Sequence, residues 1–145
     1  MKILLIHNYY RYRGGEDRYV GILEDTLIRQ GHQVIRFFYD SRDIDGFSFI
    51  KKLLIPIKLI NSPKMNRELA KLLEYEKPGL AVVHNLAPLL SLSILKVLQR
   101  KHVPILKRLE NYKFLCLNGL FLENNFNICE RCKSGNFLPG ILRRC

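Results

Sequence analysis

The stretch that decides the fold is residues 2–20, "KILLIHNYYRYRGGEDRYV". The run "KILLI" is strongly apolar, as is typical of a parallel strand that is buried on both faces. A polar, aromatic loop follows and leads to two adjacent glycines, Gly14 and Gly15. The acids Glu16 and Asp17 then open a run of apolar residues with a helical period. This order of strand, glycine loop and helix is typical of the first unit of an α/β sheet.

The alternation of strands and helices continues along the chain. Gly31 marks the end of the first helix, and "HQVIRFF" (32–38) predicts a second strand. After an irregular segment, residues 62–78 predict a helix that Ser62 caps and in which Pro63 fits the first turn.

Two more strands are predicted in the next part of the chain. "LAVVH" (80–84) predicts the third strand, a helix over 91–102 is capped by Ser91 or Ser93, and "VPILKRL" (103–109) predicts the fourth. Strands that alternate with helices predict an α/β fold with a Rossmann-like, doubly wound parallel sheet.

The alternation stops at about Phe114, and the rest of the chain is loop-like and rich in Asn and Gly. We therefore expect a Rossmann-like lobe over residues 1–113. Residues 114–145 are expected to form a cysteine-rich tail, as a subdomain of the same lobe.

The lengths of the apolar runs and the net charge limit where the protein resides and which partners it binds. No apolar run reaches the length of about 18 residues that a membrane span needs, and "MKILLIHN" is too short for a secretory signal, so we expect a cytoplasmic protein. The 24 Lys and Arg against 13 Asp and Glu give a net charge of +11. This charge favours an anionic partner, which is a phosphorylated small molecule, a nucleic acid or an acidic lipid surface.

The glycine loop is a candidate ligand site. In doubly wound sheets, ligands bind outside the carboxyl ends of the strands, where a loop enters a helix whose free amides favour an anion. Gly14 and Gly15 would let the backbone approach a phosphate or a sugar closely, and Glu16 or Asp17 could accept hydrogen bonds from sugar hydroxyls. The alternative is a tight turn with acids that merely suit the helix dipole. The dinucleotide fingerprint is incomplete, because its third glycine is missing.

Two histidines lie at the same edge of the predicted sheet. His7 and His84 each close a strand, so either side chain could reach a substrate hydroxyl. The alternative is that neighbouring backbone groups satisfy both imidazoles.

Taken with two later stretches, the glycine loop resembles the N-terminal half of a family 4 glycosyltransferase. These stretches are "EKPGLAVVHNLAPLLSLSILKVLQRKHVPILKRLENYKFLCLNG" (76–119) and the cysteine segments "ICERC" and "LRRC". The family consists of retaining, nucleotide-sugar-dependent enzymes with the two-lobed GT-B fold. The resemblance covers nearly the whole chain.

The resemblance implies that this lobe holds the acceptor and lines one side of the catalytic cleft. Gly14 and Gly15 would face the donor diphosphate or the acceptor, with His84 and Asn85 at the rim of the cleft. Glu110 takes the position of a histidine that in the family lies close to the reacting sugar, and Asn111 and Tyr112 follow it in the motif. A glutamate can accept a hydrogen bond from a hydroxyl, but it cannot supply an imidazole.

A second departure from the family is the end of the chain at Cys145. The C-terminal lobe with the donor pocket is not part of this sequence, so we expect negligible transfer activity from this lobe alone. The implied partners are a nucleotide-sugar donor, a sugar or lipid-linked acceptor and the missing donor lobe. The implied pathway is polysaccharide or glycolipid synthesis, and no catalytic metal is expected.

Residues 47–67, "FSFIKKLLIPIKLINSPKMNR", carry five Lys or Arg and no acid. Basic residues interleaved with large apolar ones can lie on an anionic bilayer, so the protein is expected at the inner membrane face as a peripheral protein. The alternative is an ordinary amphipathic connector that packs on the sheet, with Pro56 interrupting any long helix.

The four cysteines of the chain, Cys116, Cys129, Cys132 and Cys145, all lie in its last thirty residues. Their spacing is C-x12-C-x2-C-x12-C, and a central pair two residues apart can bind one metal ion from a turn. Four thiolates would complete a closed, structural Zn²⁺ site. The alternative is that the cysteines are reduced or oxidised in pairs.

The leading functional prediction is therefore the acceptor-side lobe of a glycosyltransferase, an enzyme only if a donor lobe completes it. A zinc-stabilised, basic nucleic-acid-binding module or a non-catalytic interaction module is the alternative. Nucleic acid is the less favoured partner, because the alternation of strands and helices builds a crevice rather than a recognition helix.

Overall fold

We describe the protein from a computed structural model, which covers residues 1–112, 115–123, 125–143 and 145. The chain forms two compact units, Met1–Arg108 and Leu109–Cys145, which we call the first and the second unit. Each unit is described by itself. The boundary expected between residues 113 and 114 falls on two positions outside the described residues.

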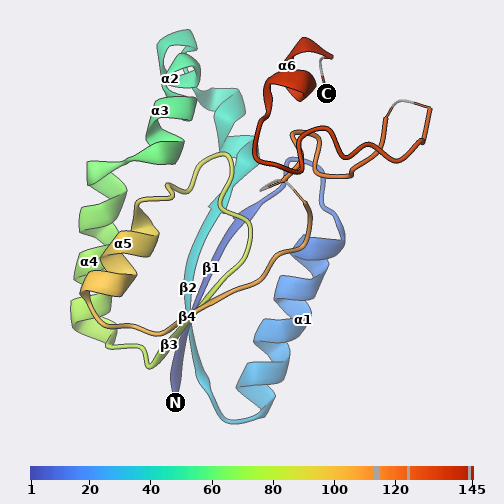
Figure 1. The fold of residues 1–145 in the computed structure, drawn as a ribbon. Helices are drawn as coiled ribbons and strands as arrows, with labels where there is room; N and C mark the ends of the chain where they lie inside the picture. The colour runs from blue at the N-terminus through green and yellow to red at the C-terminus, as the bar shows by residue number, and fades with distance from the viewer. Residues whose placement is uncertain (113–114, 124, 144) are drawn as a thin grey trace. The chain divides into compact units, whose positions relative to one another are not determined.

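The first unit is built on a four-stranded sheet in which every strand is parallel to its neighbours (Figure 1). The strands lie in the order β2-β1-β3-β4. Their bounds are β1 (Lys2–Tyr9), β2 (Gln33–Asp40), β3 (Leu80–Val83) and β4 (Ile105–Lys107). The predicted Rossmann-like α/β fold with a parallel sheet is thus confirmed. All four strands lie where the sequence predicts them, with shifted ends.

Helix α1 (Gly15–Arg29) follows the glycine loop as predicted. Its last turn is closed by Gly31, whose φ of +78° is a left-handed conformation that glycine adopts without strain. At the other end, the Asp17 carboxylate accepts a hydrogen bond from the backbone N–H of Gly14 at 3.0 Å. Because the first N–H groups of a helix have no acceptor within the helix, this bond helps to fix where α1 begins.

Helices α4 (Pro63–Glu76) and α5 (Ile94–Arg100) connect the remaining strands. The Ser62 hydroxyl accepts a hydrogen bond from the N–H of Met65, as expected of a cap. Ser93 stands at the N-cap of α5 but its side chain makes no capping bond to that helix, whose residues are all described. Its hydroxyl instead donates to the Asn66 side chain at 2.7 Å, so a contact with α4 replaces the predicted cap.

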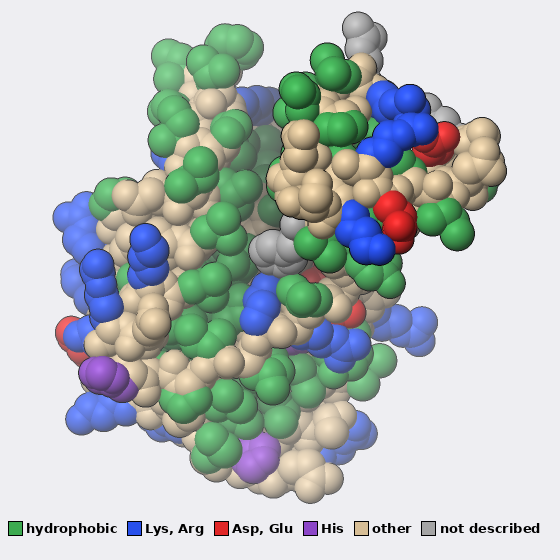
Figure 2. All heavy atoms as spheres, viewed as in Figure 1, with side chains coloured by type: hydrophobic (Ala, Val, Ile, Leu, Met, Phe, Trp, Pro, Cys, Tyr) green, Lys and Arg blue, Asp and Glu red, His purple; other side chains and the backbone are tan. Residues whose placement is uncertain are grey.

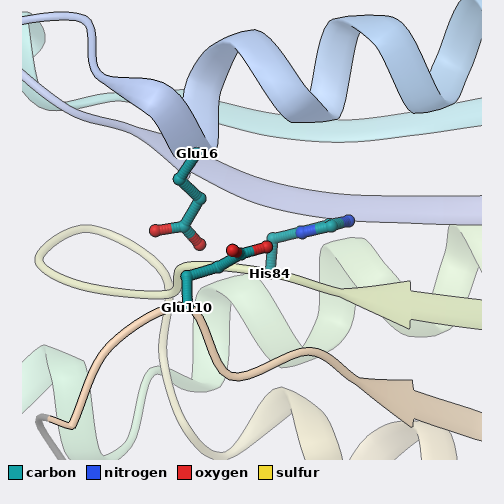
Figure 3. A group of neighbouring side chains, drawn as sticks. All are labelled: Glu16, His84 and Glu110. Carbon is teal, nitrogen blue, oxygen red and sulfur yellow. The ribbon is translucent and has the colours of Figure 1, made fainter.

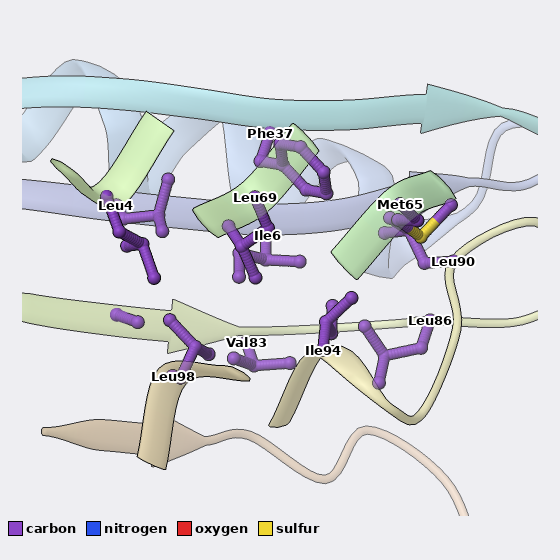
Figure 4. Packing of buried hydrophobic residues seen from close by; sticks show 12 residues of the cluster. Leu4, Ile6, Phe37, Met65, Leu69, Val83, Leu86, Leu90, Ile94 and Leu98 are labelled. Carbon is purple, nitrogen blue, oxygen red and sulfur yellow. The ribbon is translucent and has the colours of Figure 1, made fainter. Parts of the chain in front are cut away.

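Apolar side chains cover both faces of the sheet, with α4 and α5 on one face and α1 on the other (Figure 1). Leu4 and Ile6 of β1 point to the face with α4 and α5, and Ile3 and Leu5 point to the face with α1. This explains the continuous apolar run of β1, because successive side chains of a strand face opposite sides. Figure 4 shows the larger cluster, whose fully buried members are Leu4, Ile6, Leu69, Ala81, Val83, Leu90, Ile94 and Leu98.

The connection between β2 and α4 consists of a 3-10 turn, η1 (Ser41–Gly46), and two short helices, α2 (Phe49–Leu53) and α3 (Ile55–Ile60). Pro56 lies in the first turn of α3, where its missing N–H costs nothing, and α2 ends just before it. None of the residues of α2 and α3, all of which are described, is buried. The alternative interpretation, a connector that packs on the sheet, predicts buried side chains that these two helices do not have.

The second unit contains little regular structure in its described part. It has one helix, α6 (Leu138–Leu142), and an isolated antiparallel bridge between Leu122 and Ile128. Across the described residues of both units, no helix combines the length and the apolar character that a membrane crossing requires.

Candidate functional site

The candidate site lies at the carboxyl edge of the sheet, where β1 and β3 are neighbours. The chain passes from β1 to β2 on one side and later returns to place β3 on the other side of β1. Such a reversal of strand order opens a crevice at the carboxyl ends of the two strands, and this is where doubly wound folds bind ligands. His7 and Asn8 near the end of β1, and His84 and Asn85 just past β3, all fall at this position.

The glycine loop enters the same edge from β1. Gly14 has φ −122° and ψ −171°, an extended conformation that any residue can adopt. A methyl group added at Gly14 or Gly15 would meet none of the described atoms within 4 Å. Neither the backbone conformation nor internal packing therefore requires glycine here. The pair leaves room on the outer surface of the loop.

Polar contacts hold the loop in place. The Arg13 guanidinium donates to the Asp40 carboxylate at 2.7 Å and lies over the ring of Tyr9, 3.9 Å from its centroid. Arg42 binds the same carboxylate, and its hydrogen bonds hold the pKa of Asp40 well below its usual range, against the effect of partial burial. Asp40 therefore stays ionised, and it ties the loop to the end of β2.

Asp17 is buried and engaged within the protein. Its carboxylate contacts the Nε2 atom of His7 at 2.8 Å and accepts the N–H groups of Tyr10 and Gly14. Asp17 therefore shapes the loop, and of the two acids that the sequence offers for a sugar hydroxyl, only Glu16 is partly exposed. Glu16 accepts a hydrogen bond from the Tyr10 hydroxyl at 2.7 Å.

His84 lies just past β3, and Glu16 lies in the first turn of α1 (Figure 3). The His84 side chain is buried, with its ring centroid 5.9 Å from that of His7 and 5.9 Å from that of Tyr19. Burial is the largest of the effects that lower the pKa of His84 to about 4, and its neighbours His7, Lys107 and Arg108 contribute to the same shift. Near neutral pH the imidazole is therefore uncharged, with one nitrogen a donor and the other an acceptor.

Asn85 and Asn8 join the loops that leave the strands. The Asn85 side-chain amide donates to the backbone carbonyls of Asn8 and Ala87, at 2.8 and 2.7 Å. The Asn8 amide donates to Ala87 and to the hydroxyl of Ser41. The sequence analysis identified Asn85 but missed Asn8 and Ser41. The signal that could have indicated them is their position at the carboxyl ends of predicted strands. These buried amides link the ends of β1 and β3 and the loops that follow them.

Two basic residues at the end of β4 were also missed. The Nζ atom of Lys107 donates to the carbonyls of His84 and Arg108, both at 2.7 Å. The Arg108 guanidinium lies over the Tyr19 ring, 3.4 Å from its centroid. A Lys-Arg pair that closes a predicted strand could have identified them, because side chains at strand ends of one sheet meet at one edge.

Three other predicted site residues belong to the second unit: Glu110, Asn111 and Tyr112. Glu110 is also drawn in Figure 3. The Tyr112 ring contacts that of Phe121, with centroids 5.0 Å apart, and its carbonyl accepts the N–H of Cys116 at 2.8 Å. The structure thus brings together His84, Asn85 and the loop of residues 14–16 in the first unit.

The four cysteines, all described, are free thiols and line one pocket of about 340 Å³ inside the second unit. The same pocket is lined by Arg131 and Arg143, which both donate to the Glu123 carboxylate, at 2.7 and 3.2 Å. The predicted metal ligands therefore converge on one cavity, although they span thirty residues of sequence.

Compared with protein-family models, curated proteins and solved structures, the chain matches none of them.

Proposed function

We propose that this chain is the acceptor-side lobe of a retaining, nucleotide-sugar-dependent glycosyltransferase of the hexosyltransferase type. Two features at one edge of the sheet support the proposal. The strand order reverses between β1 and β3, and the glycine loop at that edge has open space outside it. Family motifs quoted from the sequence point to the same edge. The donor-side lobe that such an enzyme needs lies outside these 145 residues, and transfer requires both lobes.

Each residue at this edge has a distinct proposed role. Gly14 and Gly15 allow a phosphate or a sugar ring to approach the start of α1, whose free N–H groups and dipole favour an anion. Glu16 accepts a hydrogen bond from a sugar hydroxyl. His84, neutral at the carboxyl end of β3, is proposed as a catalytic group that meets a substrate hydroxyl, and Asn85 fixes the loop beside it. By the family resemblance, Glu110, Asn111 and Tyr112 are also proposed to contact substrate, with Glu110 as an acceptor for a hydroxyl.

We also propose that the lobe lies on an anionic membrane through α2 and α3, where it meets a lipid-linked acceptor. Apolar side chains gather at the surface over these helices (Figure 2). Phe49, Ile50 and Ile57 are 81%, 69% and 65% exposed, and Lys51, Lys52 and Lys58 lie on the same two helices. Large apolar groups next to cations suit the boundary between anionic headgroups and acyl chains.

Thermal protection by ligand tests the glycosyltransferase proposal. A nucleotide sugar or a sugar phosphate that binds the folded chain at about 100 times its Kd stabilises it by about 2.7 kcal/mol, which raises Tm by roughly 5–10 °C. We expect the Gly15→Val variant to lose this protection, because its side chain occupies the space that the ligand needs.

The Gly46→Val variant is the matched control. It too adds a side chain where no described atom lies within 4 Å, but in η1 rather than at the glycine loop. We expect it to keep full protection. If sugar nucleotides and sugar phosphates leave Tm unchanged, or if both variants respond as the parent chain does, the glycine loop is not the ligand site. Salt-dependent binding of DNA instead would favour a nucleic-acid-binding module.

A further inference from the structure

The second unit has almost no apolar core. Among its described residues, the buried side chains are those of Cys116 and Cys132. Most of its large apolar side chains are instead exposed, among them Leu117, Leu120, Phe126, Ile128, Ile141 and Leu142. A unit of 37 residues without a core needs a covalent or metal cross-link to hold one structure.

The two buried cysteines begin two turns of the same kind. Gly119 donates its N–H to the carbonyl of Cys116 at 3.0 Å, and Gly135 donates to that of Cys132 at 2.9 Å. Both glycines have left-handed backbones, with φ of +77° and +86°. In each case the sequence is Cys-x-x-Gly, and such a turn directs the following N–H groups toward the cysteine side chain.

The other two cysteines reach the same pocket by separate routes. The N–H of Cys129 donates to the carbonyl of Phe121 at 2.8 Å. Cys129 therefore lies next to the antiparallel bridge between Leu122 and Ile128. The N–H of Cys145 donates to the carbonyl of Gly140 at 3.0 Å, after the turn of α6. Gly140 packs so closely on Cys132 that a Cβ there would lie 3.3 Å from the Sγ atom.

We propose that Cys116, Cys129, Cys132 and Cys145 bind one Zn²⁺ ion as a closed, tetrahedral, structural site that holds the second unit together. This inference is independent of the proposed glycosyltransferase function. Among the described residues, no three of the cysteines already stand together as a group of metal ligands, so the ion draws the thiolates together as it binds. Zn–S bonds of about 2.3 Å with all four sulfurs leave no position for substrate.

The positive net charge of the second unit suits the negative charge of a zinc site with four thiolates. Four thiolates around Zn²⁺ carry a net charge of −2. The second unit has five Lys and Arg against three Asp and Glu, a formal net charge of +2. Arg131 and Arg143 line the pocket itself.

Metal analysis of the full 145-residue chain tests the proposal. Purified with a reductant and ZnCl₂ and then desalted, the chain should retain one zinc per molecule. Replacement by Co²⁺ should give the intense d–d absorption of a tetrahedral ion and a sulfur-to-cobalt charge-transfer band. A zinc content far below one per chain, or the weak absorption of octahedral cobalt, would overturn the proposal.

Substitutions identify the ligands. We expect Cys129→Ser and Cys145→Ser each to weaken zinc affinity by at least about 100-fold. Substitution of residues that only hydrogen-bond to metal ligands already weakens metal affinity about 10- to 100-fold, and loss of a ligand should cost at least as much. Ser134→Ala, an exposed change between Cys132 and Gly135, is the matched control and should bind zinc as the parent does. Mass spectrometry of the zinc-free parent, alkylated without prior reduction, should find four alkylatable thiols. Cysteines joined in pairs under these conditions would contradict the site, and this test does not depend on how the variants fold.

Discussion

His84 shows how one buried side chain makes stability depend on pH. Its pKa is lowered from 6.5 to about 4 in the folded protein, first by burial and then by neighbouring positive charges. Above pH 6.5 the imidazole is neutral in both the folded and the unfolded chain, so it contributes no pH dependence. Between pH 6.5 and 4 the unfolded chain binds the proton more readily, and the folded state is destabilised as the pH falls.

We predict that the free energy of unfolding decreases by on the order of 2 kcal/mol between pH 7 and 4.5 because of His84. Urea unfolding of the parent and of His84→Gln at both pH values measures this, and the variant should show a smaller decrease. His102→Gln, at an exposed histidine, should behave as the parent does. Equal pH dependence in the parent and in His84→Gln would contradict the lowered pKa.

At the scale of elements, α2 and α3 differ from the other helices of the first unit. Helices α1, α4 and α5 each bury side chains, whereas the described residues of α2 and α3 bury none. Exposure of apolar side chains is a cost in water that an interface with lipid removes. The basic residues of the same helices select anionic lipid.

We predict that the chain sediments with vesicles that contain phosphatidylglycerol and much less with pure phosphatidylcholine. Changing Lys51, Lys52 and Lys58 to Glu should abolish this binding, since each cation near the surface contributes on the order of 1 kcal/mol. Added salt should weaken the binding of the parent. Changing Lys71, Lys96 and Arg100 to Glu alters the net charge equally and should have a much smaller effect. Equal losses in both variants would show that net charge, rather than α2 and α3, causes the binding.

At the scale of the whole molecule, the two units rely on different forces. The first unit is stabilised by apolar clusters on both faces of a sheet, and the second is proposed to depend on a metal ion. Binding energy of a structural metal is folding energy of the part that binds it. Removal of the metal should therefore affect the two units unequally.

We predict that a strong zinc chelator removes hydrogen-exchange protection from the amides of the second unit and leaves Leu4, Leu5 and Ile6 of β1 protected. Added Zn²⁺ should restore the protection, and Mg²⁺, which prefers oxygen ligands, should not. Exchange measured by mass spectrometry with peptide resolution checks this. Loss of protection in β1 to the same extent would show that the units unfold together.

Local sequence patterns were enough to predict which segments become strands and helices in the first unit. This succeeded because the signals are local. A buried parallel strand needs a continuous apolar run such as "KILLI", a helix needs a 3.6-residue period, and Gly31 and Ser62 mark helix ends through their own backbone and side-chain chemistry. The spacing of the cysteines was likewise sufficient to nominate four metal ligands.

Which polar groups of those segments form hydrogen bonds with one another was apparent only from the tertiary structure. Asp17 binds His7 and two backbone N–H groups in place of a ligand, and Ser93 bonds to α4 in place of capping α5. The strand order that places β1 beside β3, the missed residues Asn8 and Lys107, and the common pocket of the cysteines also came from the structure. The physical reason is that a hydrogen bond depends on which groups meet in space, and groups that meet here are up to 79 residues apart.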